Sequence, residues 1–148
     1  MDNHPSTKLS EDSPSVQAHL AIIQAVIDRM AVNSTSTKAW CVTLVSAVLV
    51  LVADSGNSAF ALVALIPGIL FAALDAYYLA LEKGFRNAYK EFVLKVHTGK
   101  LTTSDLFEIT PKGAPCELRF DAIRSFSIWS FYGALTILIM IAWQVLFI

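Results

Sequence analysis

The segment FAALDAYYLALEKGFR, residues 71–86, passes from apolar to charged sequence while keeping the spacing of one helix. The run before it, 59–74, has no charged residue, and helical spacing continues after Leu81 to Gly99, a residue typical of helix C-termini. A helix over 59–97 would be almost ~60 Å long, about twice the ~30 Å hydrocarbon core of a bilayer. We therefore predict that 59–81 crosses a membrane, with a bend at Pro67 and Gly68, and that the helix continues beyond the membrane to residue 97.

Two further runs have the composition of membrane spans. The chain of 148 residues is 55% hydrophobic and only 16% charged, whereas soluble domains carry about a quarter charged residues. Residues 125–148 contain no charge, and 37–53 contain only Lys38, whose long side chain can reach the membrane surface. The expected fold class is an all-α integral membrane protein with three transmembrane helices, 37–53, 59–81 and 125–148, within a single domain, 13–148.

An amphipathic helix is expected before the first span. Residues 1–12 are polar and are expected to be disordered, and Ser13 with Pro14 has the pattern of a helix start. Apolar residues recur at helical spacing over 13–33, in a segment too polar to cross a membrane. This helix is expected either on the inner membrane surface or against the cytoplasmic helices, with 33–38, NSTSTK, joining it to the first span. His19 falls on its apolar side, either as a half-buried histidine with one hydrogen bond or as a pH switch.

The remaining segment, 98–124, is expected to be a cytoplasmic loop that leads into the third span. Asp105 and Glu108 have the spacing of a capping box, which predicts a short helical turn. Pro115 is expected to begin a juxtamembrane segment.

Basic residues predict the orientation. The chain has 11 Lys and Arg residues, and all of them precede the first span or lie between the second and third. Positive charge marks the cytoplasmic side of a membrane protein. We therefore predict that the N-terminus and the 82–124 region are cytoplasmic and that the C-terminus lies on the opposite side of the membrane.

Asp75 would lie about 24 Å down a ~30 Å core, near the inner interface. On a helical wheel it shares one stripe with Tyr78, Glu82 and Arg86, and its expected partner is a cation at the end of a neighbouring span. The candidates for this interhelical polar seam are Asp75, Tyr78, Glu82, Arg86, Lys38 and Arg124. A structural pairing role is the favoured interpretation, and an ion or proton pathway is the alternative, because acids inside membranes often serve transport.

Small polar residues gather at the start of the first span. A predicted packing cluster contains Asn33, Ser34, Ser36, Thr43 and Ser46. Such residues let helices approach closely and hydrogen-bond across an interface. Together with the seam they provide more polar surface than three helices need, so a homo-oligomer is expected.

Motifs for catalysis are missing from the sequence. There is no HExxH, GxSxG or phosphate-binding loop, and no cluster of His, Cys and Asp residues. Cys41 and Cys116 lack metal or redox spacing and are expected to be reduced thiols. We expect no enzyme activity, cofactor or metal. The net charge of −1 argues against nucleic-acid binding, and the basic residues of 82–124 are expected to contact anionic membrane lipid.

Three motifs resemble those of a widespread group of small bacterial membrane proteins. They are R-M-x-x-N-S, K-x-W-C-V-T-L and L-D-x-Y-Y-L-x-x-E-x-x-F-R, and the likeness covers most of the chain. Their residues here are Arg29, Met30, Asn33, Ser34, Lys38, Trp40, Asp75, Tyr77, Tyr78, Glu82, Phe85 and Arg86. The layout also resembles SLATT-type two-span effectors and the accessory membrane proteins of the RADAR and type VI-B CRISPR antiphage systems. A third span departs from the two-span effectors.

Two functions stay open at this point. The resemblance implies an oligomeric accessory protein, or an effector that perturbs the membrane, in antiphage defence. It also implies a location in the bacterial inner membrane, where the predicted orientation places the C-terminus in the periplasm. The alternative is a constitutive membrane anchor that recruits a cytoplasmic protein partner through residues 82–124.

Overall fold

A computed structural model describes residues 9–55 and 58–147. The described chain is all-α. Its helices are α1 (Pro14–Ser55), α2 (Leu65–His97), α3 (Pro115–Ile123) and α4 (Phe126–Phe147), with 3-10 helices η1 (Ser58–Ala64) and η2 (Thr103–Asp105). Three helical segments are long and apolar enough to cross a membrane: α1, η1 with α2, and α4. The predicted disorder of 1–12 falls mainly on residues outside the described part.

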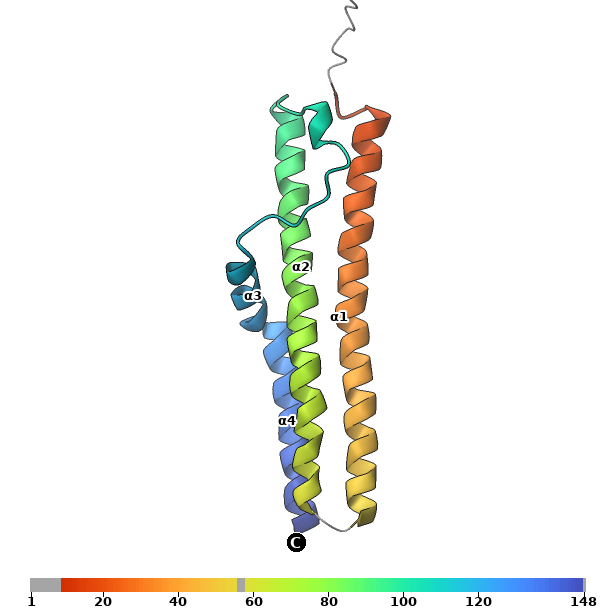
Figure 1. Ribbon diagram of the computed structural model, residues 1–148, viewed down its shortest axis with the longest axis vertical. Coiled ribbons are helices and arrows are strands. Elements are labelled where there is room, and N and C mark those ends of the chain that lie inside the picture. The colour runs from red at the N-terminus through yellow and green to blue at the C-terminus, as the bar shows by residue number, and fades with distance from the viewer. Residues whose placement is uncertain (1–8, 56–57, 148) are drawn as a thin grey trace, which may run out of the picture.

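Helices α1 and α2 form a long antiparallel hairpin, and α4 runs beside only one half of it (Figure 1). The other half of the hairpin is accompanied by the segment 98–114, which returns along α2 toward α3. The hairpin is therefore about twice as long as the part of it that packs against α4. This division fits the prediction that the second span continues beyond the membrane as the same helix.

The amphipathic helix and the first span, predicted as separate segments 13–33 and 37–53, form one continuous helix. The hydroxyl groups of the NSTSTK segment cause no break because the helix itself supplies acceptors. Thr35 donates to the carbonyl of Ala31 at 3.1 Å and Thr37 to that of Asn33 at 2.7 Å. The first half of α1 packs against α2, so of its two predicted positions the structure has the one in which this segment packs against another helix.

One face of α1 is buried along almost its whole length. Buried residues recur every three or four positions from the start of the helix to Val45, and one more follows two turns later: Val16, His19, Ile23, Ile27, Met30, Ser34, Thr37, Cys41, Val45 and Val52. This spacing keeps one face of the helix on its partner. The buried face continues from the polar half of α1 into the apolar half without a change of side. The same face of the helix therefore packs against its neighbours in both halves.

The second span begins differently from the prediction. Residues 58–64 form a 3-10 helix, and the α-helix begins at Leu65. Pro67 therefore stands in the first turn of α2, where its missing N–H removes no intrahelical hydrogen bond. A bend was predicted at Pro67 and Gly68. The structure instead has a change from 3-10 helix to α-helix after Ala64.

The predicted end of α2 is confirmed. Gly99 has a φ of 64°, and its N–H donates to the carbonyl of Val96 at 3.1 Å, while the N–H of Lys100 donates to that of Lys95 at 3.0 Å. These two bonds are a Schellman motif, which needs a left-handed residue and favours glycine there. The chain thereby turns back along α2.

The short turn in 98–124 has a different cap from the predicted one. Thr102 and Asp105, not Asp105 and Glu108, form the capping box of η2. Thr102 supplies the hydroxyl that accepts from the N–H of the third residue, a role that the carboxylate of Asp105 was expected to fill. The segment predicted to begin at Pro115 is a short helix, α3, with Pro115 as its first residue.

Bulky apolar side chains remain on the outside of the three candidate spans. Val50, Leu51, Ile69 and Val145 are each about two-thirds exposed, at 68%, 70%, 69% and 66%. Continuous apolar surface of this kind is unusual for a soluble monomer. Such an apolar surface is stable in contact with lipid, which supports a membrane location.

Candidate functional site

The most buried charged group of the described chain is Asp75, whose residue has an exposed fraction of 0%. The Oδ1 atom of Asp75 accepts a hydrogen bond from the Ser34 hydroxyl at 2.5 Å. The Oδ2 atom pairs with the Nζ of Lys38 at 2.6 Å. The same Nζ donates to Ser34 Oγ at 3.1 Å, so the three side chains form a closed triangle.

The helices bring these side chains together in a simple way. Ser34 and Lys38 are one turn apart on α1, so both point to the same side of that helix. Asp75 lies opposite them on α2, beside the buried Ala76 and one turn before the buried Ala80. Small residues at these positions let the two helices approach closely. A buried carboxylate is tolerated when it is paired and hydrogen-bonded, and this triangle supplies both interactions.

Tyr132 adds a group from the third span. Its hydroxyl is buried and interacts with the charge of Asp75 and with Cys41. The Tyr132 hydroxyl and the Oδ2 of Asp75 are buried polar atoms for which the described chain supplies no partner with hydrogen-bond geometry. The contact of Oδ2 with Lys38 is thus a close ion pair. The Tyr132 hydroxyl makes no hydrogen bond with the carboxylate of Asp75. The cluster links α1 firmly to α2 and reaches α4 through a weaker contact.

The other seam residues lie elsewhere. Glu82 and Arg86 form their own pair at 2.8 Å, in which the Arg86 side chain is 58% exposed. Tyr78 is half-buried, with its ring 5.8 Å from that of Tyr77. Arg124 lies over the Phe120 ring at 5.5 Å, so Lys38 is the cation that pairs with Asp75. The predicted polar seam therefore divides into a buried ion pair, Asp75 with Lys38, and a more exposed ion pair, Glu82 with Arg86.

The predicted packing cluster is also divided. Ser34 is buried in the Asp75 triangle, and Asn33 is half-buried. Ser36, Thr43 and Ser46 are exposed, with the Thr43 hydroxyl bonded to the carbonyl of Ala39 in its own helix. These exposed hydroxyl groups remain available to other helices.

A second polar site surrounds His19, which is 1% exposed. Its Nδ1 accepts the N–H of Phe107 at 2.8 Å, and its ring lies 4.2 Å from that of Phe92. Phe107 has a φ of 67°, a strained value for a residue with a side chain. Burial lowers the pKa of His19, and the charge of Asp105 opposes this effect. The histidine is more deeply buried than predicted, and its neutral form holds the returning segment against α1 and α2.

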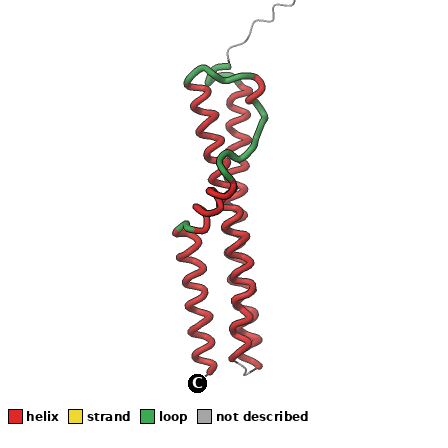
Figure 2. The backbone as a smooth tube through the Cα atoms, turned by 60° about the vertical axis from the view of Figure 1, so that its left-hand side comes forward, coloured by secondary structure: helices red, strands yellow, loops and turns green. Residues whose placement is uncertain are grey.

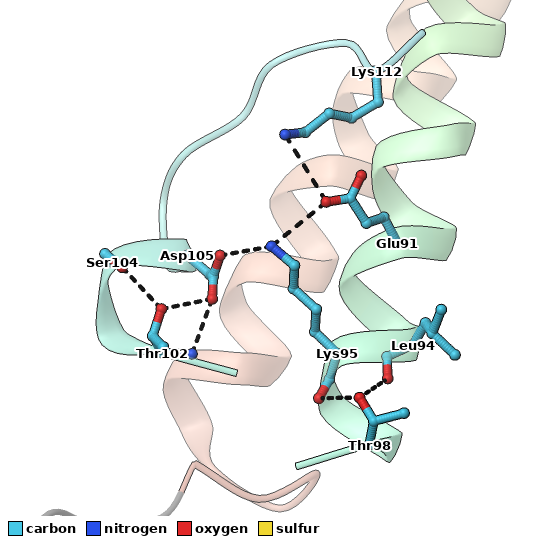
Figure 3. Close-up of polar contacts among 8 residues, drawn as sticks. All are labelled: Glu91, Leu94, Lys95, Thr98, Thr102, Ser104, Asp105 and Lys112. Atoms are coloured by element: carbon cyan, nitrogen blue, oxygen red, sulfur yellow. Dashed lines mark hydrogen bonds and ion pairs between the residues drawn. The ribbon is translucent and has the colours of Figure 1, made fainter. Parts of the chain in front are cut away.

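An ion-pair network next to His19 fixes the start of that segment (Figure 3). Lys95 of α2 pairs with Asp105 at 2.9 Å and with Glu91 at 3.5 Å, and Lys112 approaches Glu91 at 4.0 Å. The hydrogen bonds of Asp105 to Lys95 and Thr102 lower the pKa of its carboxyl to about 2. Local sequence patterns did not predict this network. The spacing of Thr102 and Asp105 was a signal for the capping box of η2, which holds Asp105 in place.

Known proteins give no further guidance to the site: comparison of the chain with protein-family models, curated proteins and solved structures finds no match. The described residues also contain no group of three His, Cys, Asp or Glu side chains that could hold a metal ion.

Proposed function

We propose that this chain is a non-enzymatic bacterial inner-membrane protein that self-associates in the bilayer, and that it acts as an accessory protein or membrane-perturbing effector in antiphage defence. Its N-terminus and the 82–124 region face the cytoplasm in this proposal. The three candidate spans support the membrane location. Self-association is supported by the surface between α1 and α4.

An open groove of about 430 Å³ separates α1 from α4. Its walls are apolar apart from the hydroxyls of Ser46 on α1 and Ser130 on α4, and both serines are exposed. Neither hydroxyl has a hydrogen-bond partner within the described chain. Small polar residues at this depth favour contact with another helix over contact with lipid tails. This groove is the observation that most favours an oligomer.

Some of the residues behind the resemblance meet at one place in the fold. Ser34, Lys38 and Asp75 come from three different motifs, and they meet in one buried triangle. A shared triangle of this kind would give the resembling proteins a common α1–α2 hairpin. The activity itself rests on the resemblance.

Disulfide crosslinking tests the self-association. In a background of Cys41→Ala and Cys116→Ala, chains with Ser46→Cys are mixed in membranes with chains carrying Ser130→Cys. We expect an oxidised dimer that contains one chain of each kind. Ala47→Cys serves as the matched control, because Ala47 is an exposed residue of α1 next to Ser46 but outside the groove. Dimer yields equal to that of the control would contradict a contact at the groove.

Membrane depolarisation tests the effector role. Cells that carry the protein together with its flanking genes should lose membrane potential after phage infection, and cells with the variant Ser46→Leu should lose it less. Unchanged potential in infected cells, with the protein present in the membrane, would contradict a membrane-perturbing role.

A membrane anchor for a cytoplasmic partner is the second candidate. The specific observation in its favour is the long α1–α2 hairpin beyond α4, together with the returning segment that accompanies it (Figure 1). In this case, reversing the charges of Lys100 and Glu108, two exposed residues of that segment, should abolish recruitment of the partner and leave the membrane potential unaffected. A gene for a nuclease, deaminase or nucleotide cyclase beside this one would favour the defence role.

A further inference from the structure

A second open groove lies where α3 turns into α4 beside α2, and it has a volume of about 530 Å³. Figure 2 shows α3 as the short link between the returning segment and α4. The α2 wall consists of Ala72, Ala73 and Ala76, whose small side chains leave the space unfilled. The opposite wall is formed by Ile123 and Ile128. The volume falls within the ~300–1,000 Å³ typical of small-molecule sites.

One cation, Arg119, lines this apolar groove. It also lines a smaller neighbouring groove of about 210 Å³, so the two grooves share this residue. Arg119 forms no ion pair or hydrogen bond with any described residue. Tyr77 of α2 lines both grooves as well and supplies a phenol.

The acidic residues of α3 do not neutralise Arg119. Glu117 and Asp121 are two positions away on either side, which places them on the opposite face of the helix. Ile123, one turn after Arg119, lies on the same face as the cation and lines the same groove. Lys83 of α2 donates to the backbone carbonyl of Asp121 at 2.9 Å and so fixes α3 in place. The groove therefore presents an unpaired positive charge at the end of an apolar channel.

The position of the groove matches the edge of the hydrocarbon core. Phe126 and Trp129, in the first turn of α4, are 85% and 66% exposed. Large aromatic residues with this exposure mark the interfacial region of a bilayer. Arg119 lies just outside that aromatic level, and the alanines of α2 lie toward the core.

We propose that this groove binds one anionic phospholipid, with its phosphate on Arg119 and Tyr77 and one acyl chain along the alanines of α2. Guanidinium groups bind phosphate oxygens through two parallel hydrogen bonds. The apolar walls suit an acyl chain, and a wholly polar anion would gain nothing from them. The site requires the membrane location but not the defence role, so either can fail without the other.

Fluorescence quenching measures the binding. The full chain is reconstituted in phosphatidylcholine vesicles that contain increasing fractions of brominated phosphatidylglycerol, in a Trp40→Phe, Trp143→Phe background that leaves Trp129 as the reporter. Saturable quenching at a low lipid fraction is expected. Arg119→Gln should raise the half-saturating fraction roughly fivefold or more, since one basic side chain contributes that much attraction to an anionic surface.

Four comparisons make the experiment decisive. Arg124→Gln is the matched control, because it removes an equal charge from a residue that lies over Phe120 and outside the groove; an effect equal to that of Arg119→Gln would contradict a specific site. Ala73→Leu should weaken binding by filling the channel, and unchanged binding would overturn the acyl-chain assignment. Relief of quenching by inorganic phosphate alone would assign the groove to a free anion instead. Loss of the crosslinked dimer in Arg119→Gln would assign it to a second copy of the chain.

Discussion

Asp75 carries a charge at a depth where a charge is costly, so its neighbours determine its role. The carboxylate is paired with Lys38 and hydrogen-bonded to Ser34, and its residue has no exposed surface. An ion pathway would need access for water on both sides of the acid. The closed triangle instead suits a fixed contact between α1 and α2. The favoured structural interpretation of the sequence therefore gains support from the geometry.

Substitution of Asp75 separates the two roles. Asp75→Asn should keep most of the stability, because an amide oxygen can still accept from Ser34. Asp75→Leu should lose about 1–3 kcal/mol, since it leaves Lys38 partly buried without a partner. Thermal unfolding of the purified protein in detergent measures both effects. Loss of activity in Asp75→Asn with unchanged stability and oligomer size would contradict the structural role.

A double variant provides the control for this prediction. Lys38→Met combined with Asp75→Leu should recover much of the stability lost in Asp75→Leu, because replacing both partners of a buried pair with apolar groups is often neutral. Glu82→Gln, in the pair whose Arg86 side chain is 58% exposed, should change the stability by less than about 1 kcal/mol.

His19 predicts a response to acid. Burial lowers its pKa in the folded protein, so the unfolded chain binds a proton first as the pH falls through 6.5. Stability at this site is therefore complete above pH 6.5 and decreases below it, until the folded form is also protonated. Protonation removes the acceptor for the Phe107 N–H. The charged groups around the same pocket are Glu91, Lys95, Asp105, Glu108 and Lys112.

Hydrogen exchange measures this response. The amide of Phe107 should exchange faster as the pH falls below 6.5, after correction for the intrinsic rate. His19→Asn should remove this pH dependence, because an amide oxygen can accept the same bond and does not titrate. His97→Asn is the control, since the His97 side chain is 61% exposed and should leave the dependence in place. A response that survives in His19→Asn would exclude His19 as its source.

At the level of elements, α2 organises the molecule because α1, α3, α4 and η1 all pack against it. Gly84 is the point where the returning segment approaches most closely. The N–H of Lys112 donates to the carbonyl of Gly84 at 3.0 Å. A Cβ atom at position 84 would lie 2.8 Å from the Cβ of Pro111. The segment can lie on α2 only because this residue has no side chain.

Gly84→Ala should therefore loosen the returning segment. Alanine would favour the helix by up to about 1 kcal/mol, but overpacking against Pro111 costs about 1–3 kcal/mol. Limited trypsin digestion after Lys112 should become faster than in the parent protein. Gly133→Ala is the control, because a Cβ there meets nothing within 4 Å. Equal digestion of the parent and Gly84→Ala would contradict the close contact.

The sequence predicted most elements well, because apolar run length and helix caps are local signals. The end of α2 at Gly99 and the start of α3 at Pro115 follow from such signals. The join between the amphipathic helix and the first span was missed because hydroxyl residues break helices in some settings and bond within them in others. The sequence left both Lys38 and Arg124 as possible partners of Asp75. The spacing of residues shows which side chains share a face of one helix, but it does not determine which faces of two helices meet. The contact of His19 with Phe107 depends on a loop conformation that no local pattern specifies.

At the level of the whole molecule, every functional proposal depends on orientation. The basic residues lie on one side of the three candidate spans, and the long half of the hairpin lies on the same side. This side is predicted to be cytoplasmic. The anionic lipid groove would then face the inner leaflet, and 98–114 would be open to cytoplasmic partners.

The most direct test is a pair of reporter fusions at the C-terminus of the chain, with the same two reporters at the N-terminus for comparison. Alkaline phosphatase is active only in the periplasm, and green fluorescent protein exported through the general secretory pathway does not fluoresce there. Three spans with a cytoplasmic N-terminus predict an active phosphatase and no fluorescence at the C-terminus, and fluorescence at the N-terminus. Fluorescence at both ends would contradict the three-span topology, and reversed signals would contradict the orientation.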